Sequence, residues 1–98
     1  MAKSQFRVSR AARQDLLQIG RFTERQWGKA QRNHYLRQLD EAFLLISEND
    51  SIGNTCDEIY PGYRKFFEGS HVIYYRVPDM VEIIRILHKR MDPDSHLD

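Results

Sequence analysis

Basic side chains gather toward the C-terminal end of the sequence, in segments whose residues alternate as in strands. They are Arg64, Lys65, Arg76, Arg85, Lys89 and Arg90, with His88 directly before the last two. A guanidinium is planar and permanently charged, and its fork of N–H groups matches phosphate or carboxylate oxygens. This cluster predicts a surface for a nucleic acid or an acidic partner. The alternative interpretation is charge balance, because residues 63–98 carry six bases and six acids.

The other residues capable of chemistry form no recognisable catalytic or metal-binding set. The four histidines, His34, His71, His88 and His96, are not spaced like the converging ligands of a zinc site. The chain has one cysteine, Cys56, so it can form neither an internal disulfide nor a cysteine-based metal site. Asp40-Glu41 and Asp57-Glu58 are adjacent pairs whose side chains diverge. We therefore expect no metal and no cofactor, and the sequence assigns no catalytic residue.

Hydrophobic periodicity predicts the elements that position these residues, in one α+β domain over residues 1–98. Alternation around Phe6 and Val8 indicates a short N-terminal strand, and Ser9 can cap the helix that follows. That helix ends at Trp27-Gly28, and a second runs from about 29 to 48. The very short connection requires an antiparallel helical hairpin. After a loop over 49–62, strands at 63–68, 71–77 and 80–88 form a three-stranded antiparallel meander that packs on the helices.

Two-residue turns in both hairpins would divide the meander into two faces. The face predicted to cover the helices carries Arg64, Phe66, Glu68, His71, Ile73, Tyr75, Glu82, Ile84, Ile86 and His88. The opposite face carries Tyr63, Lys65, Phe67, Val72, Tyr74, Arg76, Val81, Ile83, Arg85 and Leu87. A solvated face of an antiparallel sheet is normally polar, whereas this one is largely apolar. We therefore expect a partner to cover it.

Composition and charge set further limits on the function. With 41% hydrophobic and 30% charged residues in 98, the chain is typical of a globular protein. It has no apolar run near the ~20 residues of a membrane span and no signal-peptide pattern, so we expect a cytoplasmic protein without membrane contact. The net charge is +1, yet residues 1–37 carry nine bases against two acids and residues 38–62 carry six acids and no base. Such asymmetry favours separate electrostatic faces.

Several short motifs in a specific order resemble those of the ParE toxins, members of the RelE/ParE superfamily of type II toxin–antitoxin modules. They are Trp27-Gly28-Lys29-Ala30-Gln31, Cys56-Asp57-Glu58-Ile59, Pro61-Gly62-Tyr63-Arg64, Ser70-His71-Val72-Ile73-Tyr74-Tyr75-Arg76 and Ile84-Arg85-Ile86-Leu87-His88-Lys89-Arg90-Met91-Asp92. The resemblance covers about residues 5–97. The family fold, a helical hairpin beside an antiparallel sheet, agrees with the periodicity.

The resemblance implies a growth-arresting toxin that a cognate antitoxin neutralises by wrapping around it. It also implies DNA gyrase as the cellular target, DNA contact only through the antitoxin, and a possible higher hetero-oligomer with that antitoxin. We assign the target surface to Arg64, Arg76, Arg85, His88 and Arg90. We assign antitoxin packing to Trp27, Phe67, Tyr74 and Ile83.

Two other functions stay open. RelE-type relatives cut mRNA on the ribosome with strand Lys or Arg residues and a Tyr or His near the C-terminus. No Tyr follows Tyr75 in this sequence, and only His88 or His96 could serve as the acid, so we expect binding rather than catalysis. The third hypothesis is a module that has lost toxicity and acts only as an assembly partner.

Overall fold

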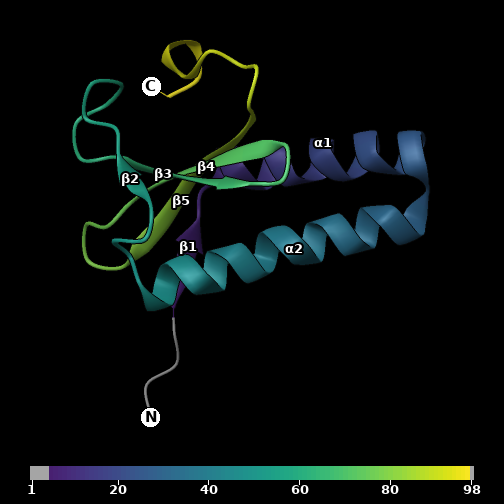
Figure 1. The fold of residues 1–98 in the computed structure, drawn as a ribbon, viewed down its shortest axis with the longest axis horizontal. Coiled ribbons are helices and arrows are strands. Elements are labelled where there is room, and N and C mark those ends of the chain that lie inside the picture. Colours follow the sequence, from purple (N-terminus) through teal and green to yellow (C-terminus); the bar gives the residue numbers. More distant parts are fainter. Residues whose placement is uncertain (1–4, 98) are drawn as a thin grey trace.

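The computed structural model describes residues 5–97, which form two helices and a mixed sheet (Figure 1). The elements are β1 (Phe6–Val8), α1 (Arg10–Trp27), α2 (Lys29–Glu48), β2 (Asn54–Thr55), β3 (Arg64–Glu68), β4 (His71–Arg76), β5 (Val81–His88) and a 3-10 turn at Pro93–Ser95. The predicted α+β class is confirmed. The strand at β2, inside the predicted loop, was not expected.

The helical hairpin begins and turns where the sequence predicts. The Ser9 hydroxyl oxygen accepts a hydrogen bond from the Ala12 amide at 3.0 Å, so it caps the first turn of α1. Gly28 alone separates α1 from α2, and its φ of +91° is a conformation that residues with a Cβ rarely adopt. Because the reversal takes one residue, the helices lie side by side and antiparallel (Figure 1).

The strands are ordered β1-β5-β4-β3-β2, so the predicted meander is the centre of a wider sheet. β1 pairs in parallel with β5, and the other neighbours are antiparallel. The Gly69-Ser70 turn has the predicted register, since Glu68 pairs with His71. Its short length fixes which side chains of β3 and β4 share a face.

The second hairpin differs from the prediction in two compensating ways. Arg76 pairs with Glu82 rather than Val81, because the turn is longer than two residues. A bulge between Tyr74 and Tyr75 then shifts the register by one more residue. The predicted faces are therefore wrong for residues 81–84. They are right for residues 85–88, because two one-residue shifts together return each side chain to its predicted face.

The sheet carries a core on each face. The larger core lies between the helices and the sheet, and its fully buried side chains include Leu39, Ile46, Ile73, Tyr75 and Ile83. Burying each such side chain stabilises the fold by roughly 1.5–3 kcal/mol. Figure 1 shows α2 below the sheet and the C-terminal segment above it.

The smaller core corrects our expectation that the outer face needs a partner. Val72, Tyr74 and Leu87 on that face are buried beneath the chain's own loop residues Cys56 and Tyr63 and its C-terminal Leu97. The apolar character of this face therefore does not by itself require a second protein. Within residues 5–97, neither helix is long and apolar enough to cross a membrane.

Candidate partner-binding groove

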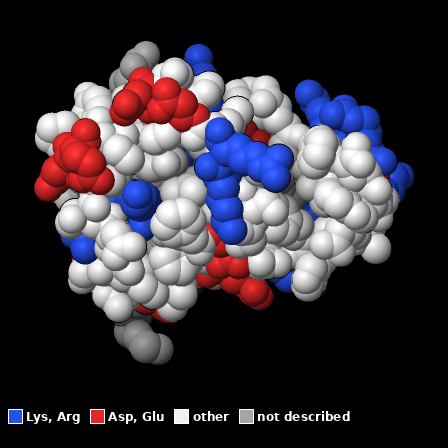
Figure 2. Space-filling view, turned by 45° about the horizontal axis from the view of Figure 1, so that its top comes forward, with Lys and Arg blue, Asp and Glu red and all other residues white. Residues whose placement is uncertain are grey.

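A groove of about 920 Å³ lies between the helical hairpin and the C-terminal end of β5. It is lined by Asp15, Gln18, Ile19, Phe22, Thr23, Trp27, Gln31, Tyr35, Ser70, His71, Arg85, Ile86, His88, Lys89, Arg90, Met91 and His96. α1 and the start of α2 supply one wall, and the β3–β4 turn, β5 and the following segment supply the other. Figure 2 shows basic side chains across the centre of this face and over the hairpin end at the right.

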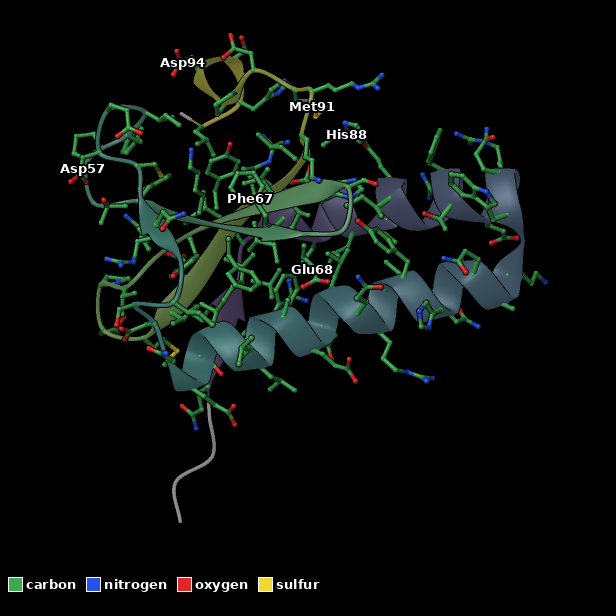
Figure 3. The ribbon with its side chains drawn as sticks, in the orientation of Figure 1. Asp57, Phe67, Glu68, His88, Met91 and Asp94 are labelled. Atoms are coloured by element: carbon green, nitrogen blue, oxygen red, sulfur yellow. The ribbon has the colours of Figure 1, made fainter. Side chains whose placement is uncertain are left out.

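An apolar wall occupies the helical side of the groove. Trp27 is 65% exposed and Phe22 is 50% exposed, and their rings meet edge to face with centroids 6.2 Å apart. Met91, across the groove, is also exposed, and Figure 3 shows it close to His88 where β5 runs into the C-terminal segment. Exposed aromatic rings beside a groove are typical of a protein-binding surface.

The floor of the groove contains a buried ion pair. The guanidinium of Arg85 donates to both carboxylate oxygens of Asp15, at 2.8 and 2.9 Å, and to the carbonyl of His96 at 2.9 Å. Asp15 also accepts the amide of Ile86 at 2.9 Å, beyond the point where β1 leaves the edge of β5. The hydrogen bond to Asp15 raises the pKa of Arg85. Asp15 thus takes the place of a neighbouring strand as the acceptor for the Ile86 amide. Through Arg85, it also holds the C-terminal segment.

The polar end of the groove is built on Tyr35, His71 and His88. The Tyr35 hydroxyl lies 2.6 Å from Nδ1 of His71 and accepts the amide of Ser70 at 3.0 Å. The rings of His71 and His88 pack edge to face with centroids 5.5 Å apart. Burial, and then the neighbouring His88, lower the pKa of His71 to about 4. Burial is also the main reason why the pKa of Tyr35 is raised. At neutral pH this end of the groove therefore holds an uncharged His71 and Tyr35.

Three of the five residues assigned to the target surface meet in this groove. Arg85, His88 and Arg90 line it, whereas Arg64 and Arg76 do not. Arg64 donates to the carbonyls of Ser51 and Gly53, so it ties β3 to the loop before β2. Arg76 pairs with Glu82 at 2.7 Å on the outer side of the sheet, which raises its pKa.

The residues assigned to antitoxin packing divide in the same way. Trp27 lies in the groove, and Phe67 is 50% exposed on the outer face beside the Lys65 ammonium, 5.8 Å from the ring centroid. Figure 3 shows Phe67 and Glu68 on opposite sides of β3, with Glu68 toward α2. Tyr74 is buried in the smaller core and Ile83 in the larger one. Their side chains therefore do not belong to an exposed surface.

Asp15, Tyr35 and His71 contribute to the groove but were not among the predicted site residues. Asp15 falls on the apolar stripe of α1, three residues after Ala12 and four before Ile19, and an acid in that position signals a buried polar contact. Tyr35 belongs to the predicted second helix, and helical periodicity does not show that its hydroxyl reaches the β3–β4 turn.

Known proteins resemble this chain in sequence. Residues 6–93 match the family described as the ParE toxin of the type II toxin–antitoxin system parDE. The chain is 43% identical over 96 residues to Toxin ParE1 of Mycobacterium tuberculosis, covering 96% of this chain and 98% of that toxin. It is 40% identical over 92 residues to Toxin ParE1 of Caulobacter vibrioides, covering 94% and 96%.

A solved structure supports the fold independently. The chain superposes on one from the chromosomal ParDE TA system of P. aeruginosa with a TM-score of 0.76 at 18% identity, covering 86% of this chain and 94% of the other. At that identity the likeness concerns the fold alone. The sequence matches extend over nearly the whole chain, and this chain belongs to the ParE toxin family of type II toxin–antitoxin systems.

Proposed function

We propose that this toxin arrests growth by binding DNA gyrase, without catalysing a reaction, and that its antitoxin neutralises it by occupying the groove beside Trp27. The toxin then acts in the cytoplasm, and it contacts DNA only through the antitoxin, in a complex that can contain several copies of each chain. Membership of the ParE family supports the toxin role and the antitoxin. The observation that favours binding over catalysis is that the strand arginines are hydrogen-bonded within the chain itself.

An RNA-cleaving enzyme needs free cations to stabilise the charge that develops on the scissile phosphate. In this chain Arg85 is held by Asp15 and a backbone carbonyl, Arg64 by two backbone carbonyls, and Arg76 by Glu82. Recruiting Arg64 or Arg85 to phosphate would break hydrogen bonds already made, at a cost of about 1–3 kcal/mol for each buried group left unpaired. The arrangement therefore favours binding over phosphodiester cleavage.

Ribosome-dependent mRNA cleavage is the second candidate, and the Tyr35–His71–His88 cluster is the observation that favours it. Histidines beside free cations can act as acid and base in RNA cleavage. The low pKa of His71 keeps its ring neutral at pH 7, and Lys89 and Arg90 lie along the same groove.

Two assays on the same induced culture and purified toxin separate these functions. We expect induction to stop growth, co-expression of the antitoxin to restore it, and purified toxin to inhibit supercoiling by gyrase in a stoichiometric manner. Primer extension on mRNA from the induced cells should show no new ends. Codon-positioned cuts together with unaffected supercoiling would instead establish the ribonuclease, and unimpaired growth with abundant folded toxin would contradict both.

A further inference from the structure

The two histidines at the polar end of the groove are direct cross-strand neighbours. His71 begins β4 and His88 ends β5, and the two residues pair in the register of the sheet. Both line the groove, and each has its Nδ1 atom within hydrogen-bonding distance of a donor from the same chain. The chemistry that each ring offers to an occupant therefore depends on what Nδ1 accepts.

The Tyr35 hydroxyl determines the tautomer of His71. That hydroxyl accepts the Ser70 amide at 3.0 Å, so its own proton is available to a second partner. His71 Nδ1 at 2.6 Å is the close acceptor, since the Glu68 carbonyl lies at 3.4 Å. The shorter distance favours donation to Nδ1, which puts the single proton of the neutral imidazole on Nε2.

A backbone amide determines the tautomer of His88. The Arg90 amide donates to Nδ1 of His88 at 3.2 Å, and an amide N–H can only donate. The Nδ1 lone pair is occupied, so the proton of His88 also resides on Nε2. Both rings accordingly offer an N–H donor rather than a lone pair, which suits an anion and not a metal ion.

The charged groups around the two histidines also favour an anion. Asp15 is the one acid among the described residues that line the groove, and both its oxygens are bound by Arg85. Among residues 5–97, no ion pair engages the side chain of Lys89 or Arg90. Two cations without an intramolecular acid therefore flank the histidine pair, a surplus that attracts negative charge.

We infer that His71 and His88 together bind a carboxylate, carried by an acidic residue of a partner segment whose apolar side chains pack against Trp27, Phe22 and Met91. A peptide with an acid next to apolar anchors matches a groove that is basic at one end and apolar at the other. A nucleic acid presents a continuous row of phosphates, which the apolar wall does not complement. The antitoxin as the source of that segment rests on the proposed function.

The tautomers and the anion site are both measurable on the purified, ¹⁵N-labelled full chain. Long-range ¹H–¹⁵N spectra of the histidine rings at neutral pH should show the proton on Nε2 of both His71 and His88. Titration with acetate at constant ionic strength should shift both Nε2–H signals saturably, whereas the uncharged isostere acetamide should not.

Substitutions test whether acetate binds at the histidine pair. His88→Ala should weaken acetate binding about tenfold, the effect of losing one hydrogen bond to a charged group. The control is His34→Gln, because His34 is exposed on α2 and does not line the groove; it should leave acetate binding unchanged.

A proton on Nδ1 of either ring, or acetate shifts no larger than those from acetamide, would overturn the inference. The spectra and titrations of the unaltered chain decide the matter even if a variant misfolds. They use neither gyrase nor antitoxin, so their failure is distinct from failure of the proposed function.

Discussion

Asp15 illustrates how a single carboxylate connects three parts of this toxin. Its oxygens accept two N–H groups of Arg85 and the amide of Ile86, and Arg85 in turn holds the carbonyl of His96. A helix, a strand edge and the C-terminal segment therefore depend on one side chain that is 8% exposed. Removing it leaves a partly buried cation without its counterion and a sheet amide without an acceptor.

Asp15→Ala should accordingly lower the free energy of unfolding by about 3 kcal/mol in urea denaturation. The matched control is Asp79→Ala, which removes the exposed ion pair with Arg7 and should cost much less, because solvent screens that pair. Similar losses in the two variants would contradict the role assigned to Asp15.

His71 should make the stability of the fold depend on pH. Its pKa is about 4 in the folded chain, against 6.5 for the unperturbed side chain, so the unfolded state binds the proton more readily. The stability that His71 contributes is present above pH 6.5 and is lost as the pH falls toward 4. Between pH 7 and pH 5 we expect a loss of about 1–2 kcal/mol, after allowance for the partial exposure of the ring.

Urea denaturation at the two pH values tests this for His71→Gln, which should remove most of that difference. His34→Gln, on the exposed side of α2, serves as the control and should preserve it. Equal pH dependence in His71→Gln and the unaltered chain would show that other groups are responsible.

Among the elements, the β3–β4 turn is held by hydrogen bonds from side chains of α2. Tyr35 binds the Ser70 amide, and Gln38 donates to the Glu68 carboxylate at 2.6 Å. Gly69 lies between these contacts at a φ of +58°, and a Cβ added there would lie 2.7 Å from the Tyr35 ring. The turn therefore requires glycine both for its backbone conformation and for its contact with the helix.

Gly69→Ala should cost about 2–3 kcal/mol in the free energy of unfolding, because conformational strain and overlap with Tyr35 add. Gly62→Ala is the matched control: its φ is +83°, but no atom lies within 4 Å of the added Cβ, so only strain of about 1 kcal/mol applies. In a Tyr35→Ala background the two substitutions should cost nearly the same, and a difference that persists would contradict the contact.

At the scale of the whole molecule, the covered outer face changes where a partner is expected. The chain's own loop and C-terminal segment bury Val72, Tyr74 and Leu87, so the exposed apolar side chains that remain include Trp27 in the groove and Phe67 on the outer face. These two aromatic residues are similarly exposed but lie at separate sites. Substituting each of them in turn tests whether the antitoxin binds in the groove or on the outer face.

Trp27→Ala should weaken antitoxin binding by about 2 kcal/mol, roughly thirtyfold in Kd, as expected for an aromatic anchor at the centre of an interface. Phe67→Ala should leave the affinity within about threefold, a difference worth under 1 kcal/mol. Calorimetric titration of each purified toxin with its antitoxin provides the measurement. A large effect of Phe67→Ala with none of Trp27→Ala would place the antitoxin on the outer face instead.

The sequence by itself determined the local features of this protein. Ser9 caps α1, Gly28 turns the hairpin and Gly69-Ser70 sets the register of β3 and β4, because each is decided by residues close together in the chain. The helical hairpin, the central meander and the family all followed from such signals. The single domain over residues 1–98 stays a prediction.

Only the tertiary structure decided which side chains are buried and which line the groove. The longer β4–β5 turn placed Ile83 in the larger core, and Leu97 returned from the far end of the chain to cover Tyr74. The contacts of Asp15 with Arg85 and of Tyr35 with His71 span 70 and 36 positions, and no local pattern encodes them. Burial and ion pairing depend on distances through space, so the groove could be recognised only after the chain had folded.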